Sequence, residues 1–174
     1  MFGKTHALVL CLLAINLTAP ATRTSADGLK VNDPFPDLTQ FKLEGKLPDL
    51  TKGHVLLVDF WATWCSPCKA SFPALDRLHS QYSERGLLIV AISVDEKQQD
   101  VERFLRKIPI HFTVIRDVEQ ELVATAKVTT MPTSFLIDRE GRVRFIHNGY
   151  RGGESDRQYA REIEQLLAAP GKSP

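Results

Sequence analysis

The sequence predicts an α/β fold in which a central mixed β-sheet is flanked by helices. Residues 54–61 form a nearly continuous apolar run with the length of a buried strand. Residues 67–84 then carry apolar side chains at helical spacing, and residues 87–94 form a second apolar run. A strand, a helix and a strand in this order favour parallel pairing through a right-handed crossover.

The rest of the chain extends this unit on both sides. Upstream, residues 30–53 are rich in Pro, Asp and Gly and predict an edge hairpin with a connecting loop. Downstream, hydrophobic spacing predicts two helices, a strand, its antiparallel partner and a final helix. We place these five elements at residues 98–107, 118–126, 133–138, 143–147 and 155–168.

Length and charge suit one compact domain. The chain has 174 residues, of which 43% are hydrophobic and 25% are charged. Its 22 Lys and Arg residues are balanced by 21 Asp and Glu residues, and no basic block is present. A nucleic acid is therefore not an expected partner.

The N-terminal residues have the organisation of a secretory signal peptide. Lys4 and His6 precede an apolar run over residues 7–17, and small residues follow at 19–21 and 24–26. The run is much shorter than the ~20 residues that span a bilayer, so a membrane tether is the less favoured alternative. We expect a signal peptide over residues 1–26, cleaved near 21–26. The remaining residues 27–174 would form one exported, soluble domain, in the periplasm or otherwise outside the cytoplasm.

Cleavage would remove Cys11 and leave Cys65 and Cys68 as the cysteines of the mature protein. Two intervening residues are too few for a bond that joins distant parts of a fold, so a structural disulfide is not expected. A structural zinc site would need four ligands, and no second cysteine pair is present. In an oxidising compartment, a Cys-x-x-Cys pair is suited to the transfer of electrons.

The position of the pair predicts different roles for the two sulfurs. Cys65 falls where a helix begins, and the backbone N–H groups there favour the thiolate that attacks disulfides. Cys68 lies one turn inside the helix, where it can attack a mixed disulfide on Cys65 and release the partner. Cys65 is the candidate nucleophile, and Cys68 is the candidate resolving thiol.

Asp59 is an acid within an apolar strand. Burial of an ionised carboxylate costs free energy unless the group is paired or has a raised pKa. Such a group can serve as a general acid and base during thiol exchange. The alternative is an Asp at the end of a strand that is hydrogen-bonded by the backbone.

Residues 55–69, which read VLLVDFWATWCSPCK, closely resemble the active-site stretch of the thioredoxin superfamily. Residues 33–37, 44–46 and 131–138 are similar to the TlpA/ResA-like branch of that superfamily. The resemblance covers about residues 30–168. It implies a thioredoxin-like fold with an N-terminal β-hairpin extension and a helical insertion before a cis-proline.

The resemblance also implies a substrate-binding surface. Pro132 would be the cis-proline that faces the disulfide, and Met131 would contact the substrate backbone. Trp64, Ser66 and Pro67 would contribute the other contacts.

For the acid, the resemblance places Asp59 at the position of the buried acid of thioredoxin. Two positions depart from the related patterns. Ser71 stands where many TlpA/ResA-like proteins have an acid, and Ile92 stands where we expect the lysine near the buried acid of thioredoxins. We therefore expect Asp59 to replace the acid missing at Ser71.

Together these features predict an enzyme that exchanges the Cys65–Cys68 disulfide with protein thiols and disulfides, with no other cofactor and no metal. Ser66 and Pro67 offer no cation that would strongly hold the Cys65 thiolate, which favours a reductant supplied by a membrane electron donor. By analogy its partners include apocytochromes, and we expect a monomer. An oxidant or isomerase is the first alternative. A Cu(I) carrier with Met131 or a histidine as a further ligand is another. A peroxide-reducing enzyme and a binding module with an idle disulfide are the remaining alternatives.

Overall fold

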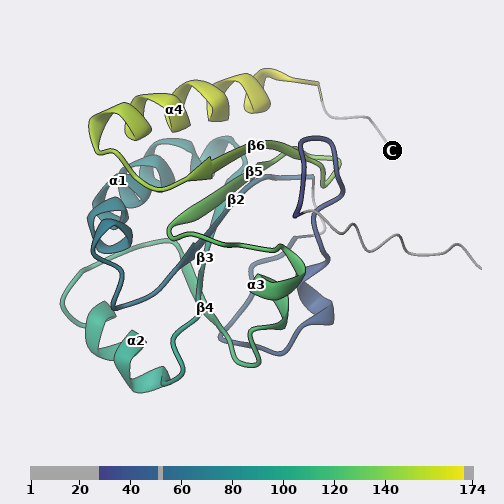
Figure 1. Ribbon diagram of the computed structural model, residues 1–174. Helices are drawn as coiled ribbons and strands as arrows, with labels where there is room; N and C mark the ends of the chain where they lie inside the picture. Colours follow the sequence, from purple (N-terminus) through teal and green to yellow (C-terminus); the bar gives the residue numbers. More distant parts are fainter. Residues whose placement is uncertain (1–27, 51–52, 171–174) are drawn as a thin grey trace, which may run out of the picture.

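A computed structural model describes residues 28–50 and 53–170 of the chain (Figure 1). The predicted signal peptide lies outside these residues, so it and the boundary of the mature domain stay predictions. Within the described ranges, no helix has the length and apolar character needed to cross a bilayer.

The core is one mixed sheet with the strand order β1-β4-β3-β2-β5-β6 (Figure 1). The strands are β1 (Leu43–Glu44), β2 (Val55–Trp61), β3 (Leu87–Ser93), β4 (Thr113–Asp117), β5 (Thr133–Ile137) and β6 (Val143–Asn148). β2 is central, pairs parallel with β3 and antiparallel with β5, and is buried along nearly its whole length. This arrangement explains why its sequence is almost continuously apolar.

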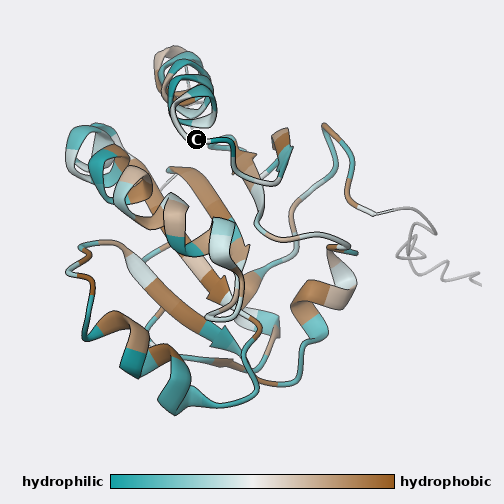
Figure 2. Ribbon diagram, turned by 60° about the vertical axis from the view of Figure 1, so that its left-hand side comes forward, coloured by the Kyte–Doolittle hydropathy of each residue, from teal (hydrophilic) through white to brown (hydrophobic). Residues whose placement is uncertain are grey.

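In the part of the chain that the structure describes, four α-helices and two short 3₁₀ helices surround the sheet. They are η1 (Leu38–Gln40), α1 (Ser66–Tyr82), η2 (Ser83–Arg85), α2 (Gln98–Leu105), α3 (Glu121–Thr125) and α4 (Gly153–Ala168). α4 lies beside α1 on the same side of the sheet (Figures 1 and 2). Arg77 of α1 pairs with Asp156 of α4 at 2.9 Å, and the Tyr82 hydroxyl donates to Glu164 at 3.0 Å.

Ring contacts identify the two faces of β2. Trp61 packs on Phe72 of α1, with ring centroids 4.5 Å apart. Phe60 instead packs on Phe135 of β5, at 6.0 Å, on the opposite face. Because side chains alternate along a strand, Asp59 lies on the same face as Trp61, toward α1. Figure 2 shows the central strands as largely hydrophobic, whereas hydrophilic and hydrophobic residues alternate along the helices.

The thioredoxin-like fold class is confirmed, including a helical insertion between β3 and β5, but two details differ. β4 was not predicted, because residues 113–117 are few and include Arg116 and Asp117. The prediction of an N-terminal hairpin was wrong, because β1 pairs antiparallel with β4 rather than with a strand next to it in the sequence. A bridge between Pro34 and Arg142 ties this N-terminal segment to the other end of the sheet.

Candidate active site

Cys65 and Cys68 form a disulfide at the start of α1, with their Cα atoms 5.3 Å apart. Cys65 is the N-cap residue, and its Sγ accepts a hydrogen bond from the Cys68 backbone N–H at 3.2 Å. Cys65 is 6% exposed and Cys68 is fully buried, so an incoming sulfur can approach only Cys65. The same N–H would stabilise a Cys65 thiolate after reduction.

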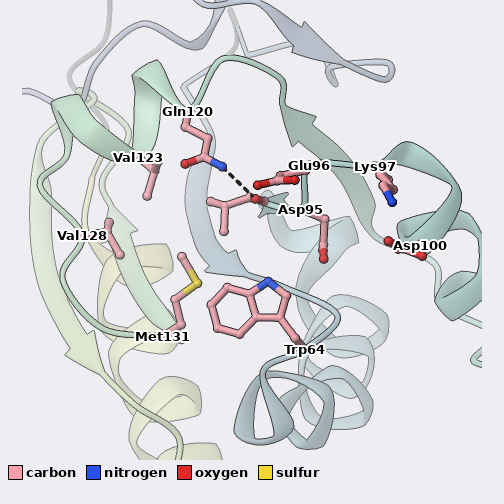
Figure 3. Close-up of a pocket in the computed structure, with 10 residues that line it drawn as sticks. Trp64, Asp95, Glu96, Lys97, Asp100, Gln120, Val123, Val128 and Met131 are labelled. Atoms are coloured by element: carbon pink, nitrogen blue, oxygen red, sulfur yellow. Dashed lines mark hydrogen bonds between the residues drawn. The ribbon is translucent and has the colours of Figure 1, made fainter.

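Trp64 is an exposed residue directly before Cys65 of the disulfide. Its side chain is 68% exposed, although it is large and apolar. Two adjoining hollows of about 580 and 540 Å³ share Trp64, Val128 and Met131 as lining residues. Figure 3 shows Trp64 and Met131 next to each other at one end of the larger hollow. The surface beside the disulfide therefore offers an apolar contact area in an open groove.

The other predicted substrate contacts lie at the same place. Ser66 and Pro67 are exposed and line the smaller hollow together with Cys65 and Met131. The peptide bond between Met131 and Pro132 is cis, as the resemblance implied. The structure thus brings these predicted positions together, while their roles in binding stay predictions.

Asp59 is 1% exposed. Burial raises the pKa of its carboxyl from an ordinary 3.8 to about 7, and a hydrogen bond from Ser134 acts in the opposite direction. That bond joins Ser134 Oγ to Asp59 Oδ1 at 2.5 Å. Asp59 Oδ2 is also buried and has no hydrogen-bond partner among the described residues. The carboxyl can therefore hold or lose a proton near neutral pH.

The structure shows where Ser71 and Ile92, the two positions that depart from the related patterns, lie relative to Asp59. Ala91, not Ile92, is the β3 residue paired with Asp59, so a methyl group lies beside the acid on that strand. Ser71 is buried, and its hydroxyl donates to the Cys68 carbonyl at 2.8 Å. The Ser71 side chain therefore forms a hydrogen bond to the backbone of α1, and the buried acid on this face of β2 is Asp59.

A second buried acid, Asp95, was missed in the sequence. It follows β3, and its carboxylate accepts hydrogen bonds from Thr63 N at 2.9 Å, Thr63 Oγ1 at 2.7 Å and Ser93 Oγ at 2.8 Å. Thr63 lies two residues before Cys65, so Asp95 fixes the loop that carries Trp64. Its place directly after an apolar strand was the one available signal.

Replacing Asp95 with Ala should lower the free energy of unfolding by about 3 kcal/mol, because three hydrogen bonds to a buried carboxylate are lost. Asp100 is a matched control, since it lines the same hollow but is partly exposed and forms an ion pair with Arg103 at the surface. Asp100→Ala should change stability by less than about 0.5 kcal/mol. Urea unfolding of the three proteins measures both effects, and equal losses for the two variants would contradict the assignment.

Metal binding is not an evident use of these side chains. Within residues 28–50 and 53–170, no three His, Cys, Asp or Glu side chains form a group that could hold a metal ion.

The sheet order, the disulfide at the start of α1 and the cis-proline before β5 define a thioredoxin-like protein that exchanges thiols and disulfides. Residues 30–163 match the family model described as redoxin. The thiol-disulfide oxidoreductase ResA of Geobacillus thermodenitrificans is 31% identical, over 92% of this chain and 94% of its own. The chain belongs to the redoxin family and is a thiol-disulfide oxidoreductase.

Solved structures agree with this assignment. A candidate thiol:disulfide interchange protein DsbE from Chlorobium tepidum is 37% identical and superposes with a TM-score of 0.74, covering 81% of this chain and 100% of its own. StoA from Bacillus subtilis is 26% identical, with a TM-score of 0.56 over 63% of this chain and 84% of its own.

Proposed function

We propose that this protein reduces disulfides in exported partner proteins, with Cys65 as the nucleophile and Cys68 as the resolving thiol. One observation carries the proposal: the disulfide lies at the N-terminus of α1 with Cys68 fully buried, beside the exposed Trp64. This asymmetry suits an attack at one sulfur and resolution by the other.

The reaction transfers two electrons to the partner. The Cys65 thiolate attacks one sulfur of the partner disulfide, which breaks the partner S–S bond and releases one partner thiolate. Cys68 then loses its proton and attacks Cys65 Sγ. The Cys65–Cys68 disulfide forms, the mixed disulfide breaks, and the second partner thiolate leaves.

Asp59 is the proposed acceptor of the Cys68 proton. Its side chain lies on the face of β2 that is covered by α1, the helix that contains Cys68. Because its pKa is raised to about 7, the carboxyl can take up a proton at neutral pH and return it when the reaction runs backward. A carboxyl with an ordinary pKa would be a much weaker base for a thiol.

Several features favour the reducing direction. The residues between the cysteines, Ser66 and Pro67, are uncharged and add no cation to stabilise the Cys65 thiolate beyond the helix N-terminus. Reduction in an exported setting requires electrons from a membrane donor. The N-terminal sequence favours export to the periplasm, and the resemblance of residues 33–37, 44–46 and 131–138 to the TlpA/ResA-like branch makes apocytochromes candidate partners by analogy.

A turnover assay tests the function. Reduction of insulin disulfides by dithiothreitol should be accelerated by the wild-type protein and not by Cys65→Ser. If the protein instead accelerates the oxidation of reduced peptides and fails to reduce insulin, the reducing direction is wrong.

Trp64 should contribute to the binding of protein substrates. Trp64→Ala should raise KM for a protein disulfide about tenfold, because an exposed aromatic contact is lost, and should leave stability within about 0.5 kcal/mol. The rate with dithiothreitol, which is too small to fill the groove, should stay the same. Exposed Val31 is a control site, since Val31→Ala removes apolar surface elsewhere. Equal KM changes in the two variants would argue against a contact at Trp64.

A further inference from the structure

We propose that Ser134 and Tyr159 are positioning residues for Asp59, forming a hydrogen-bond relay that orients its carboxyl and sets which oxygen exchanges the proton. The inference rests on the proposed function, in which Asp59 serves Cys68. Both residues lie outside the Cys-x-x-Cys motif, Ser134 in β5 and Tyr159 in α4.

The relay is built from three elements that meet on one face of the sheet. Asp59 of β2 and Ser134 of β5 are directly paired in antiparallel register, so their side chains lie on the same face. Tyr159 of α4 covers them, with its hydroxyl 2.9 Å from Ser134 Oγ. Asp59, Ser134 and Tyr159 are 1%, 0% and 1% exposed. The three polar groups are thus enclosed together.

The number of hydroxyl protons determines which group donates and which accepts in each hydrogen bond of the relay. An ionised carboxylate can only accept, so the 2.5 Å bond to Asp59 Oδ1 uses the single proton of the Ser134 hydroxyl. The Tyr159 hydroxyl must then donate to Ser134 Oγ. The resulting order is Tyr159 to Ser134 to Asp59, with each donor polarised by the next.

Tyr159 is suited to remain a neutral donor. Burial first, and then the nearby Asp59 charge, raise the pKa of its hydroxyl above the ordinary value, and the hydrogen bond with Ser134 acts in the opposite direction with a smaller effect. The His147 ring meets the Tyr159 ring edge-on at 4.8 Å between centroids. His147 is held in turn by Glu162 through a contact of 2.6 Å. These contacts restrict rotation of Tyr159 away from Ser134.

The relay occupies one oxygen of the Asp59 carboxyl and leaves the other free to exchange a proton. With Oδ1 occupied by Ser134, Oδ2 is the buried oxygen without a hydrogen-bond partner in the described part of the chain. A proton taken up by the carboxyl would therefore be placed on Oδ2. Loss of Ser134 would remove this distinction between the two oxygens and also remove a bond that favours the ionised form.

The test is a titration of the Asp59 carboxyl by ¹³C NMR in the oxidised protein, where neither cysteine titrates. Ser134→Ala should raise the pKa of Asp59 by about one unit, because a hydrogen bond to the charged form is lost. Tyr159→Phe keeps the ring and should shift the pKa upward by a smaller amount. Ser134→Thr should restore the wild-type value.

Tyr82→Phe is the matched control. Tyr82 is also a buried tyrosine between α1 and α4, and its hydroxyl bonds Glu164 rather than the relay. This variant should leave the Asp59 titration unchanged. An unchanged titration in both Ser134→Ala and Tyr159→Phe would overturn the relay, as would an equal shift in Tyr82→Phe.

The pH profile of thiol exchange separates this inference from the function on which it rests. The profile of Ser134→Ala should move to higher pH in parallel with its carboxyl titration. A shifted titration together with wild-type exchange kinetics in Asp59→Asn would support the relay and contradict the proton role of Asp59.

Discussion

Cys68→Ser should capture partner proteins as stable mixed disulfides through Cys65, and Cys65→Ser should capture none. The reason is the asymmetry of the pair: Cys65 is the accessible sulfur at the N-terminus of α1, and Cys68 is buried behind it. Without the Cys68 thiol, the covalent intermediate cannot be resolved. Both variants should fall to roughly the uncatalysed rate of disulfide exchange.

Non-reducing electrophoresis and mass spectrometry measure this capture. Both variants should remain folded, because the disulfide closes a very short loop and such loops contribute least to stability. Circular dichroism provides that control. Mixed disulfides formed equally through Cys68 in Cys65→Ser would show that the proposed order of attack is wrong.

Asp59→Asn should change stability in a strongly pH-dependent way. In the folded protein the pKa of Asp59 is about 7, and its ordinary value is 3.8. The folded state therefore binds more protons than the unfolded state between these values, and this contribution to stability is lost as pH rises. Above about pH 7 the wild-type protein must keep a buried charge that the variant lacks.

The expected size follows from the shift in pKa. We compare the free energy of unfolding of Asp59→Asn with that of the wild type at two pH values. The difference, variant minus wild type, should be about 3 kcal/mol more favourable to the variant at about pH 8 than at about pH 4.5. Other titrating groups are common to both proteins and cancel in this comparison. Asp100→Asn, at a partly exposed site, should show no such trend. Urea unfolding at the two pH values measures the difference, and a pH-independent offset would contradict a raised pKa at Asp59.

Local patterns in the sequence predicted the catalytic elements well. The apolar run of β2, the cysteine pair and the helical spacing of α1 are contiguous, so the strand, the turn and the helix N-terminus could be placed from neighbouring residues. Asp59 was identifiable because a carboxyl within an apolar strand requires an explanation.

The contacts that surround this element could not be predicted in the same way. Ser134 and Asp59 are 75 residues apart, and β5 is buried on both faces, so no alternation marks Ser134 as special. Tyr159 follows the apolar spacing of α4, which by itself indicates a core residue and no hydrogen-bond partner. Asp95 reaches Thr63 across 32 residues. Such contacts depend on the order of the strands in the sheet, which neighbouring residues do not reveal, and the pairing of β1 with β4 was missed for the same reason.

The reduction potential of the Cys65–Cys68 couple distinguishes a protein disulfide reductant from an oxidant. Equilibration with dithiothreitol or glutathione buffers, followed by Trp64 fluorescence, measures it. A protein disulfide reductant should have a potential nearer the about −270 mV of thioredoxin than the about −120 mV of DsbA. A value close to that of DsbA would show that the protein is not a reductant and would assign it to disulfide oxidation or isomerisation.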